Sequence, residues 1–148
     1  MEWKMKKILA LVSLALCALA TVGTSAAQPI NARCPSEENT KIIAATGSWH
    51  DSQNVNWVVD TKGSSNSRML PPSFDGWDKA EGLFQQRDGE AASSYTPNLS
   101  CSAGNFTVIG FFPVGPYSSC SLSGVKEKLP EDTYLQCESP SSCVLACS

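Results

Sequence analysis

The stretch NFTVIGFF at residues 105–112 is the most strand-like segment of this chain, and the predicted fold is built around it. The stretch is apolar on both faces, which is typical of a strand at the centre of a sheet. Residues 113–116 (PVGP) predict a turn, because proline and glycine supply the backbone angles that turns require. Residues 117–122 are therefore expected to return as a partner strand.

The segments on either side of this hairpin predict more strands. Residues 41–49 (KIIAATGSW) are interpreted as a first strand, and the first half of residues 54–60 alternates apolar and polar side chains, the pattern of a half-buried strand. Residues 50–53 predict a turn, so these two strands are expected to form a hairpin. Residues 133–137 (TYLQC) predict a further short strand.

One segment favours a helix. In residues 74–86 the large apolar side chains and Ala80 recur at spacings that place them on one helical face, and Ser73 is a suitable N-terminal cap. Strong helix formers are otherwise few, whereas Ser, Gly, Pro, Asn and Thr abound, which favours strands and turns. The expected fold is mainly β: a small single-domain antiparallel sheet or sandwich with one short helix, stapled by disulfides.

Cysteines indicate what holds this fold together. One of the seven, Cys17, lies in the N-terminal segment; the other six are Cys34, Cys101, Cys120, Cys137, Cys143 and Cys147. An even set in a short exported chain is typical of a disulfide framework. Six cysteines allow 15 connectivities. Pairing Cys120 with Cys137 is attractive, because they lie symmetrically about the connection at residues 124–133, but the other pairings stay open.

The N-terminal segment has the parts of a secretory signal: lysines near the start, an apolar run at residues 8–22, and small residues after it. The run is roughly 15 residues long, whereas a membrane-spanning helix needs about 20, so cleavage is favoured over a retained anchor. Cleavage after Ala26 or Ala27 assigns residues 1–26 to the signal and residues 27–148 to a single cysteine-stapled β-rich domain. We expect an exported protein, secreted or periplasmic, with no membrane association after cleavage.

The charge of the mature chain limits the class of partner. The whole chain has 11 basic and 14 acidic residues; three of the lysines and one glutamate belong to the signal, which leaves a net charge of about −5. An acidic chain without a basic run offers phosphate backbones little attraction, so nucleic acid is not an expected partner. Anionic membrane surfaces are disfavoured for the same reason.

Trp49 and His50 are the candidate binding residues. A tryptophan beside a turn is a candidate for exposure, and its ring supplies contact area together with a polar handle. His50 is the only histidine and stands next to Asp51. Because adjacent residues on a turn rarely face one another productively, His50 is interpreted as a solvated residue rather than as a catalytic or metal-binding one. No catalytic residue is assigned.

No metal or other cofactor is expected. The C-terminal cysteines, Cys137, Cys143 and Cys147, could in principle hold zinc. Structural zinc sites usually show short Cys-x2-Cys pairs, which are missing here, and metal thiolates suit reducing compartments. Disulfides are therefore favoured at these positions.

Three acidic residues support an alternative function. Asp75, Asp78 and Glu81 recur at every third residue and would line one flank of the expected helix. Paired carboxylates can hydrolyse glycosides when they are held at a set separation, although such a row is usually just a solvated face. The alternative to a binding role is thus a small exported carboxylate-dependent hydrolase, and an envelope structural protein is a third possibility.

Several short motifs together resemble a family of small exported bacterial domains with no assigned function. The motifs are Cys34-Pro35, Trp49 and Trp57, Phe74 with Ala80, and Tyr134-x2-Cys137 followed by Cys143. They span most of the mature chain, whereas Cys120 and Cys147 depart from the pattern. The resemblance implies an exported β-rich module and assigns no catalytic residue. In a bacterial protein, the N-glycosylation patterns at Asn98 and Asn105 would be incidental.

A binding role is thus favoured over an enzymatic one. We expect a disulfide-stabilised module that interacts with an unknown extracytoplasmic protein or glycan, for example as an inhibitor or a host-directed factor. The motivation is a rigid cross-linked scaffold that can hold loops in place for contact. Residues 61–73 and 88–100 are the longest predicted loops.

Overall fold

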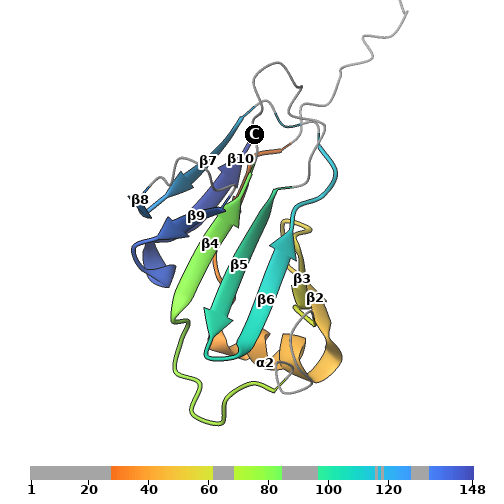
Figure 1. Cartoon of the computed structure of the whole chain (residues 1–148). Coiled ribbons are helices and arrows are strands. Elements are labelled where there is room, and N and C mark those ends of the chain that lie inside the picture. Colours follow the sequence, from red (N-terminus) through yellow and green to blue (C-terminus); the bar gives the residue numbers. More distant parts are fainter. Residues whose placement is uncertain (1–27, 62–68, 85–96, 116, 118, 128–133) are drawn as a thin grey trace, which may run out of the picture.

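The computed structural model describes residues 28–61, 69–84, 97–115, 117, 119–127 and 134–148. In this part of the chain, ten strands form two antiparallel sheets, joined by one α-helix and one short 3-10 helix, η3 (Pro140–Ser142), between β9 and β10 (Figure 1). Three disulfides link the elements. The expected mainly β, antiparallel, disulfide-stapled fold with one short helix is confirmed. The predicted signal lies outside the described residues, as do most of the two predicted long loops.

The larger sheet contains seven strands, and the segment that dominated the sequence pattern lies at its centre. In spatial order the strands are β2 (Ser48–His50), β3 (Asn56–Val59), β6 (Phe106–Phe111), β5 (Asn98–Ala103), β4 (Lys79–Leu83), β9 (Tyr134–Cys137) and β8 (Val125–Glu127). β6 is thus hydrogen-bonded on both sides, and Phe106 and Val108 point into the core with no exposed surface. Strand predictions at 105–112 and 133–137 are therefore confirmed.

The smaller sheet has three strands, in the order β1 (Ile30–Ala32), β10 (Val144–Cys147) and β7 (Cys120–Ser123). It packs against one face of the larger sheet. A Cβ atom at Gly82 of β4 would lie only 2.9 Å from Cδ1 of Leu122 in β7, so the glycine permits this close approach. Buried side chains of both sheets, such as Leu145 and Leu99, form a single core cluster.

The helix lies at a different place from the predicted one. α2 spans Glu37–Thr46 and packs beside β2 and β3 at the lower end of the sheet in Figure 1. Its start is capped by Ser36, whose side chain accepts from the backbone N–H of Asn39, and it ends at Gly47, which has φ of 87°. Ser at the N-cap and left-handed Gly at the C-cap are strong helix boundaries. The strand predicted at residues 41–49 is therefore wrong except at its end.

The helix predicted at residues 74–86 is also wrong. Its described second half is β4, in which Ala80 and Gly82 are buried while the residues between them are partly exposed. Phe74 and Trp77 are three residues apart, a spacing that predicts one face of a helix. These rings instead pack against each other with centroids 5.1 Å apart, in the segment before β4. Tertiary pairing with β5 and β9 therefore overrides the local pattern.

Two strand pairings were expected, and one of them forms. β2 and β3 make the predicted hairpin, with Trp49 opposite Trp57. The partner strand expected at 117–122 does not return along β6; instead β7 joins the smaller sheet and pairs with β10. The charged connection after it contains a short strand, β8, paired with β9.

All six cysteines are paired, but not as the chain spacing suggested. The bridges are Cys34–Cys101, Cys120–Cys147 and Cys137–Cys143. The attractive Cys120–Cys137 pairing is therefore wrong. Cys120 and Cys147 stand directly opposite each other in the β7–β10 register, with Cα atoms 4.1 Å apart, so strand pairing rather than symmetry in the sequence selected the partners.

Candidate functional site

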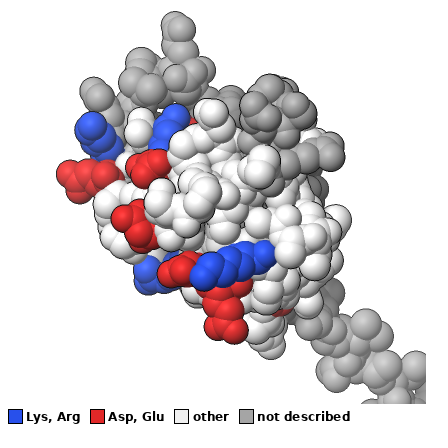
Figure 2. Space-filling view, turned by 90° about the horizontal axis from the view of Figure 1, so that it is seen from below, with Lys and Arg blue, Asp and Glu red and all other residues white. Residues whose placement is uncertain are grey.

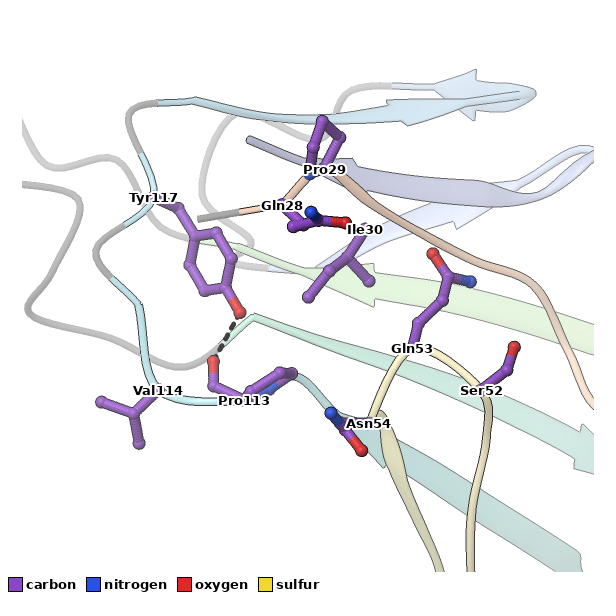
Figure 3. Close-up of a pocket in the computed structure, with 9 residues that line it drawn as sticks. All are labelled: Gln28, Pro29, Ile30, Ser52, Gln53, Asn54, Pro113, Val114 and Tyr117. Atoms are coloured by element: carbon purple, nitrogen blue, oxygen red, sulfur yellow. Dashed lines mark hydrogen bonds between the residues drawn. The ribbon is translucent and has the colours of Figure 1, made fainter. Parts of the chain in front are cut away.

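A cavity of about 440 Å³ opens where three separate segments meet (Figure 3). This volume falls within the range of small-molecule sites, roughly 300–1,000 Å³. The segments are the entry to β1, the turn between β2 and β3, and the connection after β6. The lining residues are Gln28, Pro29, Ile30, Ser52, Gln53, Asn54, Pro113, Val114 and Tyr117.

The turn between β2 and β3 is held in shape by one carboxylate. Oδ1 of Asp51 accepts hydrogen bonds from the backbone N–H groups of Gln53 (2.8 Å) and Val55 (3.0 Å), and Oδ2 accepts from Nε1 of Trp57 (3.2 Å). An aspartate that binds backbone groups further along is a common way to fix a tight turn. Asn54 has a φ of 61°, a left-handed conformation that asparagine tolerates. The turn therefore presents Gln53 in a fixed position.

Gln53 is bound to the edge of β1. Its Nε2 donates to the carbonyl oxygen of Asn31 (2.9 Å), and its Oε1 accepts from the backbone N–H of Asn31 (2.9 Å). β1 is at the end of the smaller sheet, so within the described part of the chain no strand lies beside these two backbone groups. The side-chain amide of Gln53 thus occupies the place that the backbone of a further strand would take.

The third wall is formed around Tyr117. Its hydroxyl donates to the carbonyl oxygen of Pro113 (2.5 Å), and its ring packs edge-on against Phe112 with centroids 6.2 Å apart. The side chain is almost completely buried, and this desolvation raises the pKa of the Tyr117 phenol. Val114 at the rim is 89% exposed, and Figure 3 shows it directed away from the cavity.

The lining determines which chemistry the cavity can support. None of its nine residues carries a charged side chain. Ile30 and Tyr117 provide a mainly apolar floor, while Gln28, Gln53 and Asn54 offer amide groups that both donate and accept hydrogen bonds. The lining holds no pairing of nucleophile and base. The described lining is therefore suited to contact with an uncharged group.

The structure separates the two predicted binding residues. Trp49 is partly buried and packs against the core, whereas His50 is exposed. They are neighbours on β2, and successive strand residues point to opposite faces. His50 lies opposite Asn56, whose Oδ1 is buried with no hydrogen-bond partner among the described residues. Neither Trp49 nor His50 lines the cavity, and their binding role stays a prediction.

The three acidic residues of the hydrolase hypothesis do not form the expected row. Asp75 and Asp78 precede β4, and Glu81 lies within it, so no helix aligns them. Oδ2 of Asp78 accepts from the backbone N–H of Gly104 at the β5–β6 turn (2.9 Å), and Glu81 forms an ion pair with Lys79 (2.5 Å). Two of the three carboxylates therefore have structural partners.

Neither surface charge nor clustered metal-ligand side chains indicate a second site among the described residues. In Figure 2, acidic and basic side chains are interspersed over the face in view, without a continuous patch of either sign. Among the residues that the structure describes, no group of three His, Cys, Asp or Glu side chains could hold a metal ion. In the same part of the chain, no helix is both long and apolar enough to cross a membrane.

The sequence predicts the three segments that line the cavity as turns or irregular chain, but not that they come together in space. The entry segment and the turns at 50–53 and 113–116 are recognisable from proline, glycine and polar residues. Their amide and proline side chains carry no catalytic or metal-binding motif. β1 meets the β2–β3 turn through the hydrogen bonds between Gln53 and Asn31, and the local sequence pattern does not predict this contact.

No protein-family model matches the chain, and no curated protein or solved structure matches it either. The resemblance to small exported bacterial domains therefore stays a prediction.

Proposed function

We propose that this protein is an exported, disulfide-stabilised binding module, and that the cavity beside Tyr117 holds an uncharged part of an extracytoplasmic partner. The observation that carries the proposal is the cavity itself. Three segments that are distant in the sequence enclose it, and its described lining combines an apolar floor with amide groups and no charge. Concave sites with a few well-placed polar groups are typical of binding pockets.

The walls of the cavity are fixed before any ligand arrives. Asp51 holds the β2–β3 turn through two backbone N–H groups, and the Tyr117 hydroxyl fixes the opposite wall by donating to the carbonyl oxygen of Pro113. A preorganised site loses less conformational entropy on binding, which favours affinity. The three disulfides are compatible with an extracellular, stabilised scaffold of this kind.

A pair of surface variants tests the proposal. Asn54→Asp places a charge in the lining of the cavity with almost no change in size, while Asn39→Asp makes the same change in α2, which does not line it. Oxidised, labelled protein is applied to a printed array of bacterial and host glycans and to a phage library of random peptides. We expect binding that Asn54→Asp weakens and Asn39→Asp leaves unchanged. Absence of binding to both probes, or equal binding by both variants, would contradict the proposed function.

A further inference from the structure

We propose that the partner is an extended peptide segment, which adds to the free edge of β1 as a further antiparallel strand and places one side chain in the cavity. This inference rests on the proposed function and names its partner class. The side-chain amide of Gln53 then acts as a placeholder that the peptide displaces.

The backbone of Asn31 points away from the smaller sheet. Residues opposite each other in an antiparallel pair alternate between those that exchange two hydrogen bonds and those that exchange none. Asn31 lies opposite Ala146 of β10, yet both of its backbone groups bind the Gln53 side chain. Its N–H and C=O are therefore directed outward, as the groups of an edge strand must be at every second residue.

The group that now binds the outward edge of β1 is the side-chain amide of Gln53. A primary carboxamide offers one N–H donor and one carbonyl acceptor, the same pair of groups that a peptide backbone offers. The two 2.9 Å bonds to Asn31 are those that an opposing strand residue would form. A peptide can therefore replace Gln53 without leaving the N–H or the C=O of Asn31 unpaired, which an unrelated ligand could not do as simply.

The cavity adjoins this edge and complements it. Ile30 is the neighbour of Asn31 in β1 and forms part of the floor together with Tyr117. In strand addition, main-chain hydrogen bonds supply affinity, and pockets for alternate side chains supply specificity. Since the described lining is uncharged, the side chain that enters is apolar or carries an amide or a hydroxyl. A sugar ring could fill the cavity but would make no use of the strand edge.

Two variants at one position isolate the edge. Asn31→Pro removes the outward N–H, and it breaks no bond to β10 because that N–H is not part of the ladder. Asn31→Ala is the matched control, since it removes the exposed side chain but keeps the N–H. Peptides selected from the phage library against the unmodified oxidised protein are synthesised and titrated against both. We expect Asn31→Pro to weaken binding about tenfold or more and Asn31→Ala to leave it unchanged.

An N-methyl scan of the selected peptide repeats the test with unmodified protein. Its result therefore does not depend on whether Asn31→Pro folds correctly. In a bound strand, only every second N–H faces β1. We expect methylation to abolish binding at the peptide residue opposite Asn31 and to be tolerated at its two neighbours. Equal binding by Asn31→Pro and Asn31→Ala, or a scan in which no single N–H is required, would overturn strand addition. Glycans whose binding is weakened by Asn54→Asp while no peptide binds would also overturn it, yet would leave the proposed binding function standing.

Discussion

The indole ring of Trp57 lies directly over Gly110 and occupies the space that a side chain at position 110 would need. The two residues are opposite each other in β3 and β6, and a Cβ atom at Gly110 would lie 2.8 Å from three carbons of the ring. Trp57 is 1% exposed, so its ring cannot move into solvent without loss of buried surface. We expect Gly110→Ala to lower the free energy of unfolding by about 1–3 kcal/mol through overpacking.

Chemical denaturation of the oxidised protein measures this change. The double variant Gly110→Ala with Trp57→Phe provides the control, because a smaller ring leaves room for the added methyl group. Its free energy of unfolding should exceed the value calculated by adding the two single effects. Strict additivity would mean that the ring and the methyl group do not compete for the same space.

Gln53 protects the edge of β1 in the unbound protein. Its replacement by Ala removes two hydrogen bonds to Asn31, each worth about 0.5–1.5 kcal/mol, and leaves an unpaired strand edge open. We expect a lower thermal midpoint and concentration-dependent self-association, observed by size-exclusion chromatography with light scattering. Ser52→Ala, at the exposed neighbouring residue, serves as the control. A monomeric Gln53→Ala protein of unchanged stability would show that the edge needs no protection.

The three disulfides are expected to differ in their contributions to stability. They span 67, 27 and 6 residues for Cys34–Cys101, Cys120–Cys147 and Cys137–Cys143. Loop-closure entropy then predicts about 4.4, 3.6 and 2.2 kcal/mol respectively. Replacing each pair by alanine and measuring denaturant unfolding checks the order. If removing Cys137–Cys143 caused the largest loss, constraint of the unfolded chain would not be the main source of stabilisation.

Stability should fall at alkaline pH because of Tyr117. Burial raises the pKa of its phenol above the ordinary value of 10.0, so the folded state favours the protonated form. The contribution of this group is complete below pH 10, and it is lost as pH rises from there through the higher pKa of the folded state. Denaturation midpoints at pH 9 and 11 should therefore differ less in Tyr117→Phe than in the unmodified protein. An equal decrease in both proteins would assign the pH effect to other groups.

Export and oxidation can be checked together by intact mass. We expect the exported protein to begin at Ala27 or Gln28, to be six hydrogens lighter than the reduced chain, and to resist alkylation without reductant. Alkylated cysteines would contradict the complete pairing seen in the structure. A retained N-terminal segment would support a membrane anchor in place of a cleaved signal.

The strand at the centre of the larger sheet was predictable because its own composition requires burial. Residues 105–112 are almost entirely apolar, which predicts a central strand, although the structure buries only one face: Phe106 and Val108 are fully buried, whereas Phe111 on the other face is 38% exposed. The helix was not predictable in the same way. The β-branched pair Ile42 and Ile43 favours a strand, whereas the Ser36 cap and the Gly47 stop outweigh that β preference. Boundary residues were thus more informative there than the apolar run between them.

By itself, the sequence determined the class of this protein: a mainly β chain, whose central strand and β2–β3 hairpin follow from short-range patterns, with six cysteines in an even set. Only the tertiary structure decided the partner of each cysteine, the position of β7, and the cavity between residues 28–30, 52–54 and 113–117. The physical reason is the range of the interactions involved. Side-chain alternation acts over a few residues and is visible in the sequence. Strand order and the contact of Gln53 with Asn31 depend on segments that meet only after the whole chain has packed.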